Sequence, residues 1–204
     1  MQNIRNIIFD FGGVFLTIDY SLTAKAFKAL GVHNFDELYS QHKASPLFED
    51  LETGRADEHA FYTLFRETSG HNLTDEQIKT AWNAMIGDYD KTKLDWLEKL
   101  SAKYKLYLFS NTNEIHHNAF TQLYNQQVGG KPFDAYFHKV YYSHTAGFRK
   151  PGKEAFVRLL TNENLDASET LFIDDTEVNC IGAKEAGLHT IHLKPPMTVM
   201  DLDL

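Results

Sequence analysis

The sequence lacks the features that mark disulfide-stabilised and membrane-spanning proteins. Its 204 residues include a single cysteine, Cys180, which excludes an internal disulfide. No run approaches the roughly 20 apolar residues that a membrane-spanning helix needs, and no apolar signal stretch is present. We therefore expect a cytoplasmic protein with no membrane partner.

Positive charge is also scarce. The chain carries 20 lysine and arginine residues against 28 aspartate and glutamate residues, which gives a formal net charge of -8. Nucleic-acid binding needs a basic face that neutralises backbone phosphates, so this composition argues against a nucleic-acid partner. A phosphate ligand would have to be held locally, by a metal ion and one or two cationic side chains. No pattern in the sequence indicates an oligomeric state.

The sequence does contain apolar segments in which strand patterns alternate with helix patterns. Apolar runs of strand length lie at Ile4–Phe9, Lys105–Phe109, Tyr136–Tyr142, Leu171–Ile173 and His189–Leu193. Helical patterns between the later runs lie at roughly Asn113–Asn125, Lys153–Leu160 and Glu177–Ala186. Gly187 suits the left-handed position that follows a helix. The alternation predicts an α/β fold with a Rossmann-like, doubly wound parallel sheet.

The segment between about residues 19 and 88 breaks this alternation. It has no convincing strand, and its helical patterns lie near Ser21–Leu30, Phe35–Gln41, Asp57–Ser69 and Asp75–Ile86. Thr74 and Gln77 fit a capping box at the start of the last of these helices. About seventy residues of helix are too long for a crossover connection, so we expect an inserted helical cap domain. The predicted division is residues 1–17 and 91–204 for the core and residues 18–90 for the cap.

Carboxylates close two of the apolar runs. Asp10 ends the first run, and Asp174 and Asp175 end the run that begins at Thr170. The carboxyl ends of parallel strands form the sheet edge at which open α/β folds bind ligands. Carboxylates that converge there repel one another unless a hard cation joins them, and magnesium with oxygen ligands is the usual one. One member of the acidic pair has an alternative role as a helix cap.

Four short motifs, in this order along the chain, resemble those of the haloacid dehalogenase superfamily. They are Phe9-Asp10-Phe11-Gly12-Gly13-Val14, Leu108-Phe109-Ser110-Asn111-Thr112-Asn113, Gly147-Phe148-Arg149-Lys150-Pro151 and Phe172-Ile173-Asp174-Asp175-Thr176-Glu177-Val178-Asn179. Each motif alone recurs by chance, but the ordered set, placed at strand ends, is specific. The resemblance covers the predicted core, and it covers the cap only by position and helical content.

The resemblance implies a magnesium-dependent phosphatase that hydrolyses a small phosphorylated metabolite, possible substrates including a sugar phosphate. Asp10 would be the nucleophile and would form an aspartyl-phosphate intermediate. Magnesium would be held by Asp10, the backbone carbonyl of Gly12 and Asp175, with Asp174 assisting directly or through water.

The resemblance also implies how the phosphoryl group is bound. Ser110 and Asn111 would donate hydrogen bonds to its oxygens, and Lys150 would neutralise the phosphate and the nucleophile together. Each of these residues has a structural alternative. Ser110 could simply end a strand, Asn111 and Asn113 could cap the next helix, and Lys150 could be a solvated loop cation. The ordered set of motifs favours the catalytic roles.

Gly12 departs from the usual family pattern. Most phosphate-transferring members carry a second aspartate there, which protonates the leaving group and later activates water; glycine can do neither. Phosphomutase activity is therefore disfavoured. Hydrolysis remains open for a good leaving group, such as a glycosyl or acyl phosphate, or where water or a cap residue replaces the acid. Asp19 and His144 are candidates for that replacement. A family subset with Asp-x-Gly in the first motif, which includes a sugar-1-phosphate phosphatase, also resembles this chain.

Two other functions remain as alternatives. A binding or regulatory protein could have kept the metal site and lost turnover together with the missing acid. A metal-independent 2-haloacid dehalogenase also lacks the second aspartate, but such enzymes typically lack the acidic pair as well. Asp174 and Asp175 therefore favour phosphate chemistry over dehalogenation.

Several further residues have a structural and a functional interpretation. Glu52 and Arg55 lie in a predicted turn of the cap and are candidates for substrate selection. His116 and His117 are adjacent on a predicted helix, where neighbouring side chains diverge by about 100°, so they cannot form one metal-binding face. Cys180 is expected to be a small buried residue rather than a nucleophile.

Overall fold

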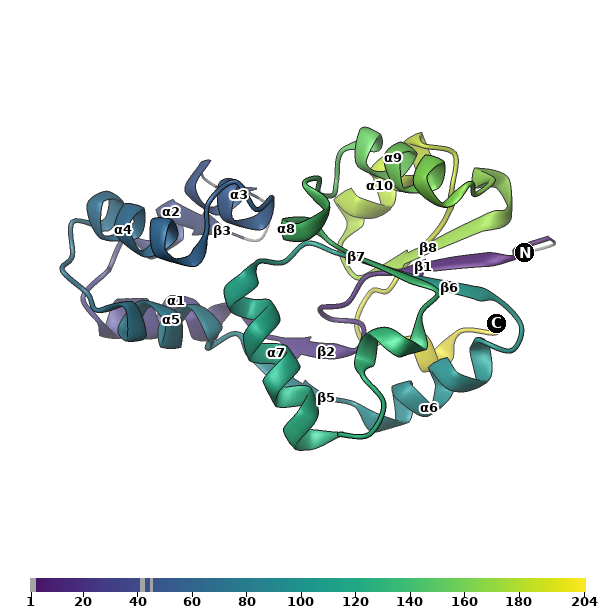
Figure 1. The fold of residues 1–204 in the computed structure, drawn as a ribbon, viewed down its shortest axis with the longest axis horizontal. Coiled ribbons are helices and arrows are strands. Elements are labelled where there is room, and N and C mark those ends of the chain that lie inside the picture. The colour runs from purple at the N-terminus through teal and green to yellow at the C-terminus, as the bar shows by residue number, and fades with distance from the viewer. Residues whose placement is uncertain (1–2, 41–42, 45) are drawn as a thin grey trace.

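The core of the molecule is a five-stranded sheet with strand order β7-β6-β1-β8-β9 (Figure 1). The computed structural model describes residues 3–40, 43–44 and 46–204. The strands are β1 (Asn6–Phe9), β6 (Lys105–Ser110), β7 (Lys139–Tyr142), β8 (Thr170–Asp174) and β9 (His189–His192). All four neighbouring pairs are parallel. The first strand is central and later strands are added on both sides of it, which confirms the predicted doubly wound, Rossmann-like topology.

Helices cover both faces of this sheet. On one face lie α6 (Lys91–Leu100) and α7 (Glu114–Gln127), and on the other lie α9 (Lys153–Glu163) and α10 (Glu177–Glu185) (Figure 1). Side chains alternate along β1, so Ile7 and Phe9 join the apolar cluster with α6, whereas Ile8 joins the cluster with α9. Because both faces are buried, each strand is a continuous apolar run, which is why the runs were visible in the sequence.

The short elements of the core refine the predicted boundaries. They are α8 (Ser143–Ala146) and the 3₁₀ helices η1 (Phe133–Tyr136), η2 (Ala167–Glu169) and η3 (Val199–Asp201). The strand predicted from Tyr136 begins only at Lys139, because the aromatic run before it forms η1 and buries Phe133 against the sheet. Gly187 follows α10 with a φ of +93°, as predicted.

The inserted segment from α1 to α5, here called the cap, extends away from one end of the sheet (Figure 1). Its helices are α1 (Tyr20–Ala29), α2 (Phe35–Leu38), α3 (Pro46–Glu52), α4 (Glu58–Ser69) and α5 (Asp75–Asn83). They enclose a separate apolar cluster that includes Phe27, Phe48, Phe61 and Trp82, all fully buried. Burying each such side chain contributes about 1.5–3 kcal/mol. The predicted capping box at Thr74 is present in both of its hydrogen bonds.

A two-stranded ribbon connects the cap to the core, and the sequence did not predict it. β2 (Leu16–Ile18) pairs antiparallel with β5 (Ile86–Tyr89). The predicted absence of strands between residues 19 and 88 was therefore wrong, and the helix predicted to reach Ile86 ends at Asn83. A second short pair joins β3 (Tyr39–Ser40) to β4 (Lys43–Ala44). Each of these short strands is stabilised by hydrogen bonds to its partner strand. Their own residues show no clear alternation of apolar and polar side chains, so the sequence did not indicate them.

Two remaining expectations concern boundaries. The helix predicted for Phe35–Gln41 ends at Leu38, and Gln41 lies outside the described residues. The division into core and cap at residues 18 and 90 stays a prediction. In the described part of the chain, no helix combines the length and the apolar character needed to cross a bilayer.

Candidate active site

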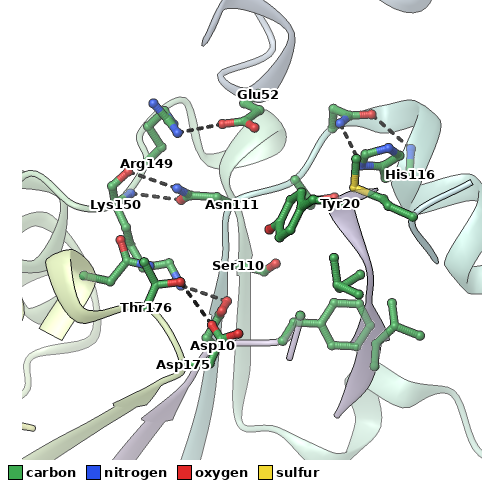
Figure 2. A pocket seen from close by; sticks show the side chains of 18 of the residues that line it. Asp10, Tyr20, Glu52, Ser110, Asn111, His116, Arg149, Lys150, Asp175 and Thr176 are labelled. Atoms are coloured by element: carbon green, nitrogen blue, oxygen red, sulfur yellow. Dashed lines mark hydrogen bonds and ion pairs between the residues drawn. The ribbon is translucent and has the colours of Figure 1, made fainter. Parts of the chain in front are cut away.

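Three adjacent strands deliver polar side chains to one edge of the sheet. Asp10 follows β1, Ser110 ends β6 and Asp174 ends β8. The backbone N–H of Asp10 donates to the carbonyl of Ile173 over 2.9 Å, which fixes Asp10 beside the end of β8. The topology of the sheet, rather than closeness in the chain, brings these residues together. Figure 2 shows Asp10 and Ser110 at this edge, with Asp175 beside Asp10.

Lys150 lies between two of the carboxylates and is almost completely buried, with 1% of its side chain exposed. Its Nζ is 2.8 Å from Asp10 Oδ1 and 2.7 Å from Asp174 Oδ2. Burial by itself lowers the pKa of Lys150, but the charges of Asp10 and Asp174 more than offset this and hold the pKa above its ordinary value. The ammonium group therefore stays charged in the site.

Asp174 is fully buried and its carboxylate is already hydrogen-bonded by the protein. Both oxygens accept from Asn179 Nδ2, at 3.0 and 3.1 Å, and Oδ1 also accepts from the backbone N–H of Thr176 at 2.7 Å. Asp175 is less buried and lines the cavity described below. The two neighbouring aspartates therefore occupy different environments, which the sequence motif alone did not reveal.

Asp10, Asp174 and Asp175 form a cluster that fits a divalent cation. One oxygen from each carboxylate lies within 4.8 Å of the others. Burial, and then the charge of Asp174, raises the pKa of Asp10 above its ordinary value, and the same two causes raise the pKa of Asp175. Lys150 supplies a single positive charge against three carboxylates. The excess negative charge is what a bound hard cation would neutralise.

The loop after β1 approaches this cluster closely because it contains two glycines. A Cβ atom at Gly13, which has a φ of +72°, would lie 2.0 Å from Asp175 Oδ2, so any side chain there would displace the carboxylate. A Cβ atom at Gly12 would lie 3.0 Å from Ile18 Cγ1. Ile18 thus occupies the space into which a side chain at position 12 would project.

Asn111 holds the backbone of Lys150. Its Nδ2 donates to the Lys150 carbonyl and its Oδ1 accepts from the Lys150 N–H, both over 2.9 Å. This double contact links the second and third motifs and fixes the position of the lysine. Ser110 is buried and faces the cavity. The prediction that Ser110 and Asn111 donate to a phosphoryl group stays a prediction.

A cavity of about 150 Å³ separates this sheet edge from the cap. Asp10, Ser110, Asn111, Lys150 and Asp175 line it from the core. From the cap and the connecting ribbon it is lined by Ile18, Tyr20, Tyr39, Glu52, Met85 and Ile86. Its small volume suits a small metabolite rather than a macromolecular substrate.

Neither predicted replacement for the missing acid lines this cavity. Asp19 is exposed and caps α1, where it accepts a hydrogen bond from the N–H of Ser21 over 2.9 Å. His144 lies in α8 and packs against the ring of His117. Of the two candidates for substrate selection, Glu52 lines the cavity, whereas Arg55 is exposed and pairs with Asp50 at 2.6 Å.

The remaining candidates have structural roles. His116 lines the cavity, while His117 packs on Phe120 and Tyr142, so the two imidazoles do face different surroundings. Burial raises the pKa of the Cys180 thiol to about 12, which argues against a nucleophilic thiolate. Sequence reasoning missed Tyr20 and Arg149 as cavity residues. Position next to Lys150 in the third motif was the available signal for Arg149.

The sequence matches the haloacid dehalogenase-like hydrolases over residues 4–187. The chain belongs to this family. It is 35% identical to the D-ribitol-5-phosphate phosphatase of Bacteroides thetaiotaomicron, over 92% of this chain and 90% of that protein. These figures extend the family assignment to both the sheet and the cap.

Solved structures of family members superpose closely on this fold. The HAD family enzyme bt-2542 from Bacteroides thetaiotaomicron, in its wild-type complex with magnesium and inorganic phosphate, is 33% identical, with a TM-score of 0.86 over 98% of this chain and all of that one (100%). A HAD-like family hydrolase from Porphyromonas gingivalis is 34% identical, with a TM-score of 0.83 over 93% and 91% of the two chains. An L-2-haloacid dehalogenase at 16% identity and a TM-score of 0.59, over 98% and 92% of the chains, shares the fold alone.

Proposed function

We propose that this protein is a magnesium-dependent phosphatase that hydrolyses a small phosphorylated metabolite, with Asp10 as the nucleophile. The observation that carries the proposal is the contact of Asp10 with Lys150, 2.8 Å away, within an acidic cluster at the end of a small cavity. The similarity to a D-ribitol-5-phosphate phosphatase supports a sugar or polyol phosphate as the substrate.

The residues present fit a magnesium ion. Asp10 and Asp175 would supply carboxylate oxygens, and Gly12 would supply its backbone carbonyl. Asp174 acts mainly through Lys150 and Asn179, because its oxygens already accept hydrogen bonds from both. The bound ion supplies positive charge between the nucleophile and the phosphate dianion, which otherwise repel each other. Crystals of the relative bt-2542 with magnesium and phosphate support this assignment.

The reaction then proceeds in two displacements. A carboxylate oxygen of Asp10 attacks phosphorus, the new O–P bond forms, and the bond from phosphorus to the ester oxygen breaks. The departing oxygen keeps the bonding electrons and takes a proton from water, since Gly12 has no side chain to donate one. A water molecule next attacks phosphorus, the bond between phosphorus and the Asp10 oxygen breaks with its electrons returning to the carboxylate, and the water gives up one proton to solvent as inorganic phosphate leaves.

Lys150 and Ser110 stabilise the charge that moves during these steps. The Lys150 ammonium stays beside Asp10 and is positioned to neutralise the phosphoryl oxygens as the ester bond breaks. Ser110 is buried at the end of β6 and its hydroxyl is a hydrogen-bond donor toward the same group. Burial of both side chains strengthens these interactions, because little water competes for them.

The first prediction tests the nucleophile. Asp10→Asn should abolish phosphate release from a panel of phosphorylated metabolites, a loss of at least about 1,000-fold, because an amide does not attack phosphorus. The control is Asp95→Asn on the exposed side of α6, which should retain activity. Phosphate release is measured with magnesium and with a chelator.

Other outcomes of that experiment favour the alternative functions. Tight binding of phosphate esters without turnover in the unsubstituted protein would indicate a regulatory protein. Metal-independent halide release from 2-haloacids would indicate a dehalogenase. Full activity in Asp10→Asn would contradict the proposed mechanism.

A further inference from the structure

The wall of the cavity carries a second charged group, which is separate from the acidic cluster and lies where the cap meets the core. Glu52, the last residue of α3, and Arg149, which precedes Lys150, face each other across the junction of cap and core (Figure 2). Glu52 Oε2 lies 2.9 Å from Arg149 Nη2, and the two side chains are 10% and 25% exposed. The pair therefore lies largely out of bulk water while lining the substrate cavity.

This pair has unused hydrogen-bonding capacity. Arg149 Nε is buried and has no hydrogen-bond partner among the residues that the structure describes. Glu52 Oε2 contacts Arg149 Nη2 at 2.9 Å, and no other polar contact of this oxygen is found among the described residues. Buried polar groups that stay unsatisfied cost about 1–3 kcal/mol each, so groups of this kind in a cavity wall indicate a ligand that completes them.

Two tyrosines extend the polar wall. Tyr20 and Tyr39 both line the cavity. Burial, followed by the charge of Glu52, raises the pKa of Tyr39. Tyr20 is 38% exposed as a residue, but desolvation of its hydroxyl at the cavity raises its pKa, and the next causes are the charges of Asp10 and Asp175, followed by Glu52. The charges of the acidic cluster and of Glu52 both act on the Tyr20 hydroxyl. Because their pKa values are raised, Tyr20 and Tyr39 stay protonated and can donate hydrogen bonds.

We propose that Glu52 and Arg149 bind hydroxyl groups of the substrate, so that the substrate is the phosphate ester of an uncharged polyol or sugar. This inference rests on the proposed phosphatase function and deepens it. A hydroxyl group both donates and accepts, whereas a carboxylate only accepts and a guanidinium only donates. An ion pair that presents both groups side by side is therefore complementary to hydroxyls. The phosphate lies at Asp10 and the hydroxyl-bearing chain extends toward the cap.

The same pair discriminates against charged substrates. A carboxylate on the substrate would meet Glu52 in a site from which water is largely excluded, where like charges repel strongly. Arg149 cannot compensate fully, because its charge is already balanced by Glu52 at 2.9 Å. The pair is close to neutral as a unit, so it selects for hydroxyls and against acids.

The test compares Glu52→Gln with Glu49→Gln, the same substitution one turn earlier on α3. Glu49 pairs with Arg55 on the exposed surface and does not line the cavity. Substrates are D-ribitol 5-phosphate, phosphoglycolate and phenyl phosphate, which carries no hydroxyl chain. For Glu52→Gln we expect kcat/KM for D-ribitol 5-phosphate to fall about tenfold or more, with a much smaller fall for phenyl phosphate. The preference for D-ribitol 5-phosphate over phosphoglycolate should shrink, and Glu49→Gln should match the unsubstituted protein.

A second variant, on the other side of the ion pair, distinguishes a loss of substrate binding from a loss of folding. Arg149→Lys keeps the charge and loses the planar set of donors, so it should reproduce the selective loss on D-ribitol 5-phosphate. Melting temperatures of all variants are measured in parallel.

Three results would overturn the inference. Equal losses on D-ribitol 5-phosphate and phenyl phosphate in both variants would mean that the pair only holds the cap in place. No loss on either ester would mean that the pair does not contact the substrate. If the unsubstituted protein with magnesium releases no phosphate even from phenyl phosphate, the proposed function fails, and the inference falls with it.

Discussion

Lys150 illustrates how single residues depend on distant partners in this site. Its ammonium group bridges Asp10 and Asp174, and its backbone is held on both sides by Asn111. Removing the lysine would leave two buried carboxylates without a counter-charge, which in other proteins costs about 3–5 kcal/mol. Lys150 is therefore a structural residue of the core as well as a proposed catalytic one.

Gly12 is the position at which the missing general acid could be introduced by substitution. The space beside it is filled by Ile18, 3.0 Å from where a Cβ atom would lie. Gly12→Asp alone therefore places a carboxylate against a side chain, whereas Gly12→Asp combined with Ile18→Ala gives it room. If the missing acid limits the rate, the double variant should hydrolyse alkyl phosphates about tenfold faster or more, since general acids contribute about 100-fold to 10,000-fold.

The comparison for this second prediction is Ile18→Ala alone, which enlarges the cavity without adding an acid. Initial rates with an alkyl phosphate and with phenyl phosphate separate the effect, because a good leaving group needs little protonation. A folded double variant with no gain on the alkyl ester would show that proton donation does not limit turnover.

At the scale of elements, the contact between α3 and α8 sets how closely the cap meets the core. Gly54, just after α3, has a φ of +69°, and a Cβ atom there would lie 2.1 Å from the carbonyl oxygen of His144 in α8. Backbone meets backbone at this point, so neither side can adjust by rotating a side chain. The contact lies close in sequence to Glu52 and supports its pairing with Arg149.

The third prediction follows from this contact. Gly54→Ala should separate α3 from α8 and raise KM for the substrate several-fold, because the cavity wall that carries Glu52 is displaced. Gly70→Ala is a matched control, since Gly70 has a φ of +71° with nothing within 4 Å of its Cβ position. Both substitutions incur similar backbone strain, of about 1 kcal/mol.

Steady-state kinetics and thermal melts distinguish the two variants of this third prediction. Both should melt at a lower temperature than the unsubstituted protein, but only Gly54→Ala should lose substrate affinity. Equal KM values for the two variants would show that the α3–α8 contact has no part in substrate binding.

At the scale of the whole molecule, His116 joins cap and core. It lies in α7, its Nε2 is 3.1 Å from the Trp82 carbonyl in α5, and its ring stacks on Trp82 with centroids 4.7 Å apart. Its Nδ1 lies 3.1 Å from Asn113 Nδ2. A neutral ring satisfies both contacts, with Nε2–H donating and Nδ1 accepting. Burial lowers the pKa of His116 to about 4.

The fourth prediction concerns the pH dependence of stability. Between about pH 6.5 and pH 4 the unfolded chain binds a proton at His116 that the folded protein excludes, so the free energy of unfolding falls as pH decreases. The loss attributable to this residue reaches about 3 kcal/mol. Urea unfolding of the unsubstituted protein and of His116→Gln, at pH 7 and pH 5, measures the effect.

We expect His116→Gln to narrow the difference in stability between the two pH values. His117 and His144, whose pKa values burial also lowers, should account for part of the remaining difference. An identical difference in both proteins would show that His116 is not the residue responsible.

The sequence by itself determined the features that depend on local pattern. Buried parallel strands are continuous apolar runs, so β1 and β8, with their terminal aspartates, were evident without a structure. The ordered motifs identified the family, and the capping box at Thr74 depends only on residues three apart. Local pattern did not fix the start of β7, because the aromatic run before it was compatible with both a strand and η1.

Only the tertiary structure decided which residues far apart in the chain meet. The pairing of β2 with β5, the space that Ile18 takes beside Gly12, and the pair of Glu52 with Arg149 all join segments from different elements. Two of these contacts join residues about 70 or more positions apart, and the third depends on how the chain turns between Gly12 and β2, so local periodicity indicates none of them. Asp174 and Asp175 are adjacent in the chain, and the structure shows that Asp174 contacts Lys150 whereas Asp175 lines the cavity.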